Sequence, residues 1–297
     1  MSIAQLQAVE FFRPRTIDDV CATMGRLHRE GFKVWAIAGC TDWMVERHAE
    51  PMVEPPPKWA AVDVHNLPEL RGIELHGEVL RVGSAEPFLQ IRRHPAVLEH
   101  LPLLAEMASE VGAEQIQARG TLGGNLASGS PAADGVAALF ALDAMVILRS
   151  ERGERSVPIT SFCTGYRSSV RTPDELIVRF DVSLPAKRAR QFWRKVGTRK
   201  AQSISKVAIA SVAETGNDGR FCRAGFGIAS VAEVVLPLQS VRDLVLGKTP
   251  AELDLEAIAQ AVDGDIRPID DLRSTATYRR HVSRTLVRGF LENFRHE

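Results

Sequence analysis

Residues 121–135 read TLGGNLASGSPAADG, a run of small and polar side chains that leads into the apolar segment Val136–Leu142. Gly123 and Gly124 permit positive φ and a close approach of the backbone to a ligand. The polar side chains offer donors to phosphate oxygens or, in the last case, an acceptor for a ribose hydroxyl: Thr121, Asn125, Ser128, Ser130 and Asp134. The stretch therefore predicts a loop that binds a nucleotide-like anion.

A structural interpretation of the same residues competes with this one. Ser130 would cap the following helix, and Pro131 would be its first residue, a position that proline favours. This alternative accounts for the Ser-Pro pair but leaves the adjacent glycines unexplained.

A second glycine segment, AGCTD at residues 38–42, follows the apolar run Lys33–Ala38, which we expect to be a buried strand. A turn of small residues after a strand lets backbone N–H groups converge on an anion, and Thr41 adds a hydroxyl donor. The alternative is a tight turn in which Thr41 or Asp42 caps a helix. The pattern alone favours that alternative.

The usual nucleotide fingerprints do not occur in this chain. Gly225-Phe226-Gly227 lacks the third glycine of G-x-G-x-x-G, and Gly247-Lys248-Thr249 follows Arg242 where a Walker motif requires glycine. The two glycine segments together predict a site for a ligand with two phosphates, held without a Rossmann fingerprint. A flavin dinucleotide fits such a site.

The composition narrows the class of protein. The 297 residues are 45% hydrophobic and 25% charged, as in an ordinary soluble globular protein. Lys plus Arg and Asp plus Glu both number 37, and this balance argues against a nucleic-acid-binding protein, which needs a basic surface. The longest apolar stretch is shorter than the roughly 20 residues of a membrane span, and the first residues do not resemble a signal peptide.

The cysteines are scattered and form no CxxC pair. They predict no zinc or iron–sulfur site within this chain and a reducing, cytoplasmic location. The four are Cys21, Cys40, Cys163 and Cys222.

Local patterns divide the chain into three domains. Residues 1–58 alternate helix and strand and end at three consecutive prolines, which regular structure does not accommodate. Residues 59–175 contain strands, helices and the glycine-rich stretch, and form the second domain. Residues 176–297 begin with β-like segments and end in an amphipathic helical tail that breaks at Pro268.

Several motifs, in the right order, resemble the FAD-binding subunit of the molybdenum hydroxylases, the family of xanthine dehydrogenase and carbon monoxide dehydrogenase. Residues 38–42 resemble that family's A-G-G-T-D loop, with Cys40 at the second glycine, and residues 121–125 its T-[IL]-G-G-N loop. The segment SPAAD at 130–134 is also similar to a family segment. Residues 62–73 are closer to the bacterial xanthine-dehydrogenase-like members than to the carbon monoxide ones. The chain departs from the family at Gln117-Ala118.

The resemblance implies an α+β fold like that of vanillyl-alcohol oxidase, with two α/β subdomains around FAD and a C-terminal domain of antiparallel sheet and helices. It also implies that the two glycine loops straddle the pyrophosphate. Asp134 would meet ribityl or ribose hydroxyls, Ile177 the adenine or dimethylbenzene side, and Lys195 the flavin ring. Without the resemblance, Lys195 would be interpreted as a solvated strand lysine. The implied cofactor-binding residues are Trp35, Ala36, Ile37, Ala38, Gly39, Cys40, Thr41, Asp42, Val111, Gly112, Thr121, Leu122, Gly123, Gly124, Asn125, Ser130, Asp134, Ile177 and Lys195.

The implied function is electron transfer. Substrate would be hydroxylated on a large subunit with a molybdenum cofactor. A small subunit with [2Fe–2S] clusters would pass electrons to this FAD, and from there they would reach NAD, a quinone or oxygen. No catalytic side chain is required. The alternatives are a stand-alone FAD-dependent oxidase, a carbon monoxide dehydrogenase-type subunit, and an assembly protein whose flavin loops have decayed. The closeness to the xanthine-dehydrogenase-like members favours purines or related N-heterocycles as the substrate of the complex.

Overall fold

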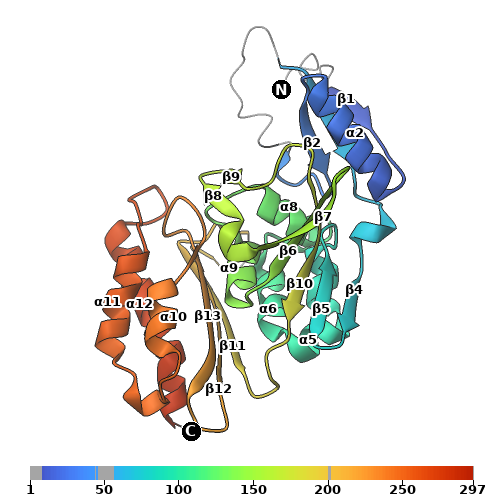
Figure 1. The fold of residues 1–297 in the computed structure, drawn as a ribbon. Helices are drawn as coiled ribbons and strands as arrows, with labels where there is room; N and C mark the ends of the chain where they lie inside the picture. The colour runs from blue at the N-terminus through green and yellow to red at the C-terminus, as the bar shows by residue number, and fades with distance from the viewer. Residues whose placement is uncertain (1–8, 44, 46–56, 200–201, 297) are drawn as a thin grey trace.

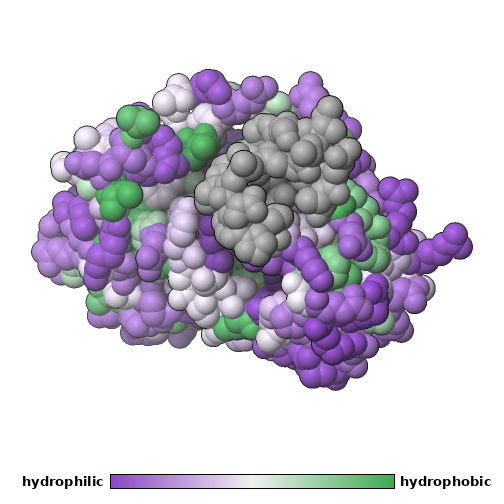
Figure 2. Space-filling model, turned by 90° about the horizontal axis from the view of Figure 1, so that it is seen from above, coloured by the Kyte–Doolittle hydropathy of each residue, from purple (hydrophilic) through white to green (hydrophobic). Residues whose placement is uncertain are grey.

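A computed structural model describes residues 9–43, 45, 57–199 and 202–296. Three main sheets of three to five strands follow one another along the described part of the chain, each with its own helices (Figure 1). Seen from above, most of the visible surface is hydrophilic, and apolar residues stand in small separate groups (Figure 2). Within the described residues, no helix combines the length and apolarity needed to cross a bilayer.

The first sheet is parallel and is packed against one helix. Its elements are β1 (Val9–Phe12), α2 (Ile17–Arg29), β2 (Lys33–Ile37) and β3 (Trp59–Asp63). β3 is the middle strand and pairs with both neighbours. The Thr16 hydroxyl caps α2 by accepting from the Asp19 amide at 3.1 Å. β2 ends at Ile37, so the residues that follow it emerge at one end of this sheet.

The second domain is an antiparallel sheet covered by a layer of short helices. Its strand order is β4-β5-β10-β6-β7. The strands are β4 (Ile73–His76), β5 (Val79–Gly83), β6 (Met145–Ser150), β7 (Gly153–Pro158) and β10 (Leu176–Ser183), with the small hairpin β8 (Cys163–Gly165) and β9 (Ser168–Ser169). The helices are α4 (Phe88–Arg93), α5 (Pro95–His100), α6 (Pro102–Glu110), α7 (Glu114–Gln117), α8 (Leu122–Ala127) and α9 (Asp134–Ala141).

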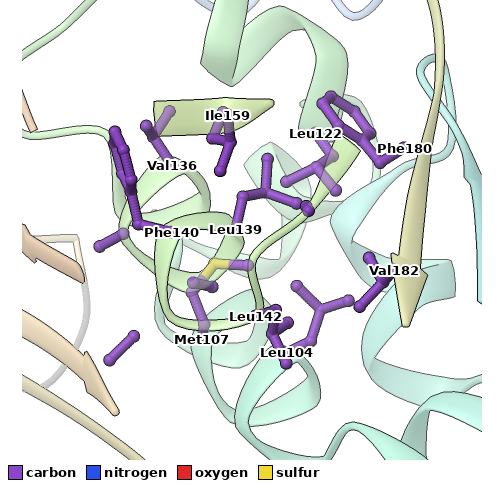
Figure 3. Packing of buried hydrophobic residues seen from close by; sticks show 14 of the residues in the cluster. Leu104, Met107, Leu122, Val136, Leu139, Phe140, Leu142, Ile159, Phe180 and Val182 are labelled. Carbon is purple, nitrogen blue, oxygen red and sulfur yellow. The ribbon is translucent and has the colours of Figure 1, made fainter. Parts of the chain in front are cut away.

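The core of this domain lies where α9 meets α6 and the sheet. Figure 3 shows Leu139 of α9 beside Met107 and Leu104 of α6, with Val182 of β10 close by. Every residue of α9 is buried, which explains why its sequence is apolar all round rather than amphipathic.

The predicted boundary between the second and third domains at residues 175/176 needs correction. Residues 176–183 form β10, which pairs with β5 on one side and β6 on the other. This strand is therefore the centre of the second sheet, and the third sheet starts at Arg190. Local sequence shows that a strand is present, but its partners lie about 30 and 100 residues upstream and are chosen by long-range pairing.

The third domain is an antiparallel sheet between two layers of helices. The strand order is β11-β12-β13-β14, and the elements are β11 (Arg190–Val196), β12 (Val207–Thr215), β13 (Phe221–Ala229), β14 (Leu236–Pro237), α10 (Gln239–Val245), α11 (Leu255–Asp265) and α12 (Ala276–Glu292). α10, α11 and α12 cover one face, and α9 of the second domain packs on the other (Figure 1). The expected α+β class, with a C-terminal antiparallel sheet and helices, is confirmed.

Two glycines of β13 explain how closely α9 approaches this sheet. A Cβ on Gly225 would lie 2.0 Å from the Ala141 carbonyl oxygen, and one on Gly227 would lie 2.0 Å from that of Ala137. The G-F-G segment is therefore a helix–sheet contact between domains and not the start of a nucleotide motif.

Candidate functional site

A cavity of about 330 Å³ lies between the first and second domains. Its walls come from β2 and the residues after it, from α8 with the residues before it, and from the start of β10. Fourteen of the expected cofactor-binding residues line it: Trp35, Ala36, Ile37, Ala38, Gly39, Cys40, Thr41, Asp42, Val111, Thr121, Gly123, Gly124, Asn125 and Ile177. The two glycine segments, about 80 residues apart in sequence, thus share one cavity.

The two segments meet through their backbones. A Cβ on Gly39 would lie 1.9 Å from the carbonyl oxygen of Arg119, which leaves no room for any side chain. Gly120 follows Arg119 in the sequence and lies near Thr41. A Cβ on Gly120 would lie 3.5 Å from the Thr41 Oγ1. Glycine at position 39 is therefore required by the contact between the two domains.

The second segment is the first turn of a helix and not an open loop, which corrects the expectation for residues 121–125. Thr121 is the N-cap of α8, and its Oγ1 accepts from the Gly124 amide at 3.0 Å. The Gly123 amide donates to the Ser84 carbonyl oxygen at 2.9 Å, and a Cβ there would lie 2.6 Å from that oxygen. Both glycines are helical, so close approach and not positive φ explains Gly123.

Asn125 links this helix to the next one. Its Oδ1 accepts from the Gly135 amide in the first turn of α9 at 3.0 Å. This bond leaves the Nδ2 amide as the donor that Asn125 can offer to the cavity. Ser130 does not cap α9, because that helix begins at Asp134, and the Ser130 Oγ accepts from the Ala132 amide at 3.2 Å. The structural interpretation of Ser130-Pro131 is therefore wrong.

Five of the expected residues lie outside the cavity wall: Gly112, Leu122, Ser130, Asp134 and Lys195. Leu122 is buried in the core of the second domain. Gly112 adopts a φ of 56° in the turn after α6. The sequence motifs did not distinguish these five positions from the neighbouring residues that line the cavity.

Asp134 and Lys195 instead contact one another where the second and third domains meet. The Lys195 Nζ lies 2.5 Å from the Asp134 Oδ2, with side-chain exposures of 9% and 7%. The same Nζ donates to the Glu110 carbonyl oxygen at 3.1 Å, and the Trp193 Nε1 donates to the Glu110 Oε2 at 2.9 Å. Burial raises the pKa of the Asp134 carboxyl, and Lys195 only partly offsets this effect. The interpretation of Lys195 as a solvated lysine is wrong.

Other cavity residues were not found from the sequence. They are Val34, Trp43, Val64, Ser84, Ala85, Phe88, Ile116, Gly120, Ala127, Arg171, Glu175 and Leu176. Ser128, which the sequence indicates as a donor to phosphate, also lines the cavity. Ser84 and Ala85 could have been found, since they are small residues directly after the strand β5, the same signal as that of residues 38–42. Arg171 and Glu175 give no local signal, because each comes into the cavity through the hairpin and strand pairings of distant segments.

Gln117, one of the departures from the family pattern, is buried and supports the turn before Gly120. Its Nε2 donates to the Ser109 carbonyl oxygen at 2.8 Å, and its Oε1 accepts from the Arg92 guanidinium. These bonds tie α7 to α6 and α4. Among the described residues, no group of three or more His, Cys, Asp or Glu side chains is placed to hold a metal ion.

Cys40, where the family has glycine, has a left-handed backbone with φ of 58°. A non-glycine residue in this region is strained by roughly 1–2 kcal/mol. Burial raises the pKa of its thiol, so the sulfur is protonated near neutral pH and is a poor nucleophile. The backbone therefore keeps the glycine-like turn, and the side chain is tolerated in it.

We expect Cys40→Gly to stabilise the protein by about 1 kcal/mol, because glycine adopts a positive φ without steric cost. Urea unfolding of the FAD-free protein measures this change. Cys40→Ala is the control, since it removes the thiol but keeps the Cβ, and it should give less than half of the gain. Equal gains from alanine and glycine would show that the thiol and not the backbone is responsible.

His65 contacts the side chain of Arg119, the residue whose carbonyl oxygen lies against Gly39. The Arg119 Nη1 lies 3.0 Å from the His65 Nε2, so a neutral imidazole accepts this hydrogen bond. Burial lowers the pKa of His65, and the neighbouring Arg119 and Arg71 lower it further. Protonation would remove the acceptor and place like charges side by side.

The stability of the protein should therefore fall on mild acidification. The unfolded state takes up a proton on His65 near pH ~6.5 while the folded state resists it, so the contribution is complete above that pH and is lost as the pH falls toward the folded pKa. We expect the free energy of unfolding to decrease as the pH falls below about 6.5. His65→Gln should reduce this slope in urea unfolding. Identical slopes in both proteins would contradict the prediction.

Family models match nearly the whole chain. A model described as the FAD binding domain in molybdopterin dehydrogenase matches residues 7–187, and one described as the CO dehydrogenase flavoprotein C-terminal domain matches residues 193–294. These ranges agree with the boundary that the sheets give, after β10 and near the start of β11.

Named relatives are similar over most of their length. The chain is 33% identical to a putative xanthine dehydrogenase FAD-binding subunit of Escherichia coli, covering 76% of this chain and 78% of the relative. It is 28% identical to the nicotinate dehydrogenase FAD-subunit of Eubacterium barkeri, covering 91% and 90%. Among solved structures, a chain of the carbon monoxide dehydrogenase from Hydrogenophaga pseudoflava superposes with a TM-score of 0.86 at 25% identity, covering 95% of each chain.

Proposed function

Since the chain belongs to the family of FAD-binding subunits of the molybdenum hydroxylases, we propose that the cavity between its first two domains holds the diphosphate-bearing part of FAD. The observation that carries this proposal is the backbone contact of the two glycine segments beside one cavity. The cavity volume falls in the range of about 300–1,000 Å³ that is typical of ligand sites.

The cavity residues suit a dinucleotide. Thr41 contributes a hydroxyl, and Asn125 an amide whose carbonyl oxygen is already held by α9. Trp35 and Ile177 supply apolar surface for a ring system. Trp35 lies within β2, Asn125 within α8 and Ile177 near the start of β10, so regular structure holds much of the wall of the site.

The domain seam, where Asp134 of the second domain meets Lys195 of the third, suits the rest of the cofactor. The Oδ1 of Asp134 is buried and has no hydrogen-bond partner among the described residues. A ribityl or ribose hydroxyl is a donor that would satisfy it. Lys195, fixed by Asp134 and Glu110, places a cation at the same seam, where it would favour negative charge on a nearby ring.

Bound FAD would supply the redox chemistry, by taking up electrons from [2Fe–2S] clusters of a small partner subunit and passing them to NAD or another acceptor. The chain's own residues bind and orient the cofactor and keep water from it. Hydroxylation would take place on a large molybdenum subunit. The names of the relatives favour a purine or a related N-heterocycle as substrate of the complex. The scattered free cysteines support a cytoplasmic location.

Purification of the chain together with its co-expressed partner chains tests this function. We expect one complex that contains FAD, iron and molybdenum, and in which substrate reduces the flavin. Mixing the reduced complex with NAD, a quinone or oxygen then identifies the acceptor by the rate of flavin reoxidation. FAD without metals, in a chain that alone oxidises a small substrate, would identify a stand-alone oxidase instead.

A further inference from the structure

Arg171 brings a positively charged residue to the cavity wall. It follows the hairpin β8–β9 and lines the cavity together with Glu175 and Ile177. Among the described residues of the cavity wall, it is the one with a positively charged side chain. Arg171 is partly buried.

Arg171 forms no direct ion pair with a carboxylate among the described residues, although Glu175 and Asp174 attract it from a greater distance. Its Nη1 donates to the backbone carbonyl oxygen of Glu175 at 2.8 Å. The Glu175 carboxylate is already engaged, because it accepts from the Arg155 Nε and Nη2 at 2.5 and 2.8 Å and from the Thr172 amide at 2.8 Å. Burial lowers the pKa of Arg171, and the charges of Glu175 and Asp174 offset this effect only in part, yet a guanidinium stays protonated.

Asp42, the other acidic residue of the described cavity wall, does not pair with Arg171 either. The pKa of Asp42 is raised by burial, and the cation that acts on it is Arg167, not Arg171. A largely buried guanidinium without a directly paired carboxylate is stabilised when an anion binds beside it. Arg171 therefore marks the part of the cavity where the anionic portion of a ligand should lie.

We propose that Arg171 recognises the diphosphate of the dinucleotide and makes the cavity selective for ligands that carry it. This inference rests on the proposed binding of FAD in this cavity. The oxidised flavin ring, the sugar chains and the adenine are neutral, so the diphosphate is the portion of FAD that an unpaired cation would bind. The planar guanidinium can donate two parallel hydrogen bonds to phosphate oxygens, which a lysine cannot.

Titration of the FAD-free, full-length chain with ADP and with adenosine tests this role, because the two probes share the base and ribose and differ in the phosphates. We expect the wild type to bind ADP at least tenfold more tightly than adenosine. Arg171→Gln should lose about tenfold or more of its ADP affinity with adenosine unchanged. Arg152→Gln is the matched control, since it removes the same charge from an exposed partner of Asp174 outside the cavity wall, and it should bind both probes as the wild type does.

Two results would overturn the inference. Equal losses for ADP and adenosine would mean that Arg171 contacts the base, and an unchanged ADP affinity would mean that it contacts no part of the ligand. If Arg171→Gln does not fold, Arg171→Lys decides: we expect a several-fold loss for ADP alone, and wild-type ADP affinity would overturn the inference. A wild-type chain that binds neither FAD nor ADP would overturn the proposed function as well, whereas FAD binding with an indifferent Arg171 overturns this inference alone.

Discussion

Gly39→Ala should abolish stable FAD binding. The new Cβ would lie 1.9 Å from the Arg119 carbonyl oxygen, so one of the two cavity walls has to move. Overpacking of this kind costs about 1–3 kcal/mol, and the displacement falls on the residues proposed to hold the diphosphate. We expect FAD affinity to fall by about 100-fold or more, measured by quenching of flavin fluorescence on titration of the FAD-free protein.

Gly289→Ala is the control for this substitution. Gly289 lies inside α12, where a Cβ would meet nothing within 4 Å. Alanine there should stabilise the protein by about 0.5–1 kcal/mol and leave FAD affinity unchanged. If Gly39→Ala binds FAD as tightly as Gly289→Ala does, the contact between the two glycine segments does not form the site.

Lys195→Met should cause the largest loss of stability among the substitutions considered. Asp134 would remain 7% exposed with neither of its oxygens paired among the described residues. Removing one partner of a buried ion pair typically costs 3–5 kcal/mol, and we expect about that loss in urea unfolding of the FAD-free protein. Because the pair joins the second domain to the third, the unfolding transition should also become less cooperative.

A double-mutant cycle separates the pair from the surrounding packing. Asp134→Leu combined with Lys195→Met replaces the ion pair by apolar groups and should recover much of the lost stability. Arg194→Met, an exposed cation on the same strand, should change stability by less than about 0.5 kcal/mol. A Lys195→Met cost no greater than that of Arg194→Met would show that the buried pair contributes nothing to the domain seam.

The features found from the sequence are those with a local cause. Residues 38–42 and 121–125 are visible because glycine and small polar residues cluster there. The family resemblance adds the order of these motifs along the chain and with it the shared cavity.

The features that escaped the sequence depend on distant partners. β10 lies at the centre of the second sheet because β5 and β6 select it, which no window around residues 176–183 reveals. Asp134 and Lys195 are 61 residues apart, and their pairing was not foreseen although both residues were singled out. Arg171 reaches the cavity through the turn after β9, and it differs from the other arginines only by its surroundings.

The most direct test of the account is the flavin content of the chain purified with its partner subunits under non-denaturing conditions. Acid release followed by chromatography identifies the flavin and gives its ratio to protein. The account predicts one FAD per chain, with that FAD lost from Gly39→Ala and retained in Gly289→Ala. A wild-type chain without FAD, or with FMN in its place, would contradict the assignment of the cavity to a dinucleotide.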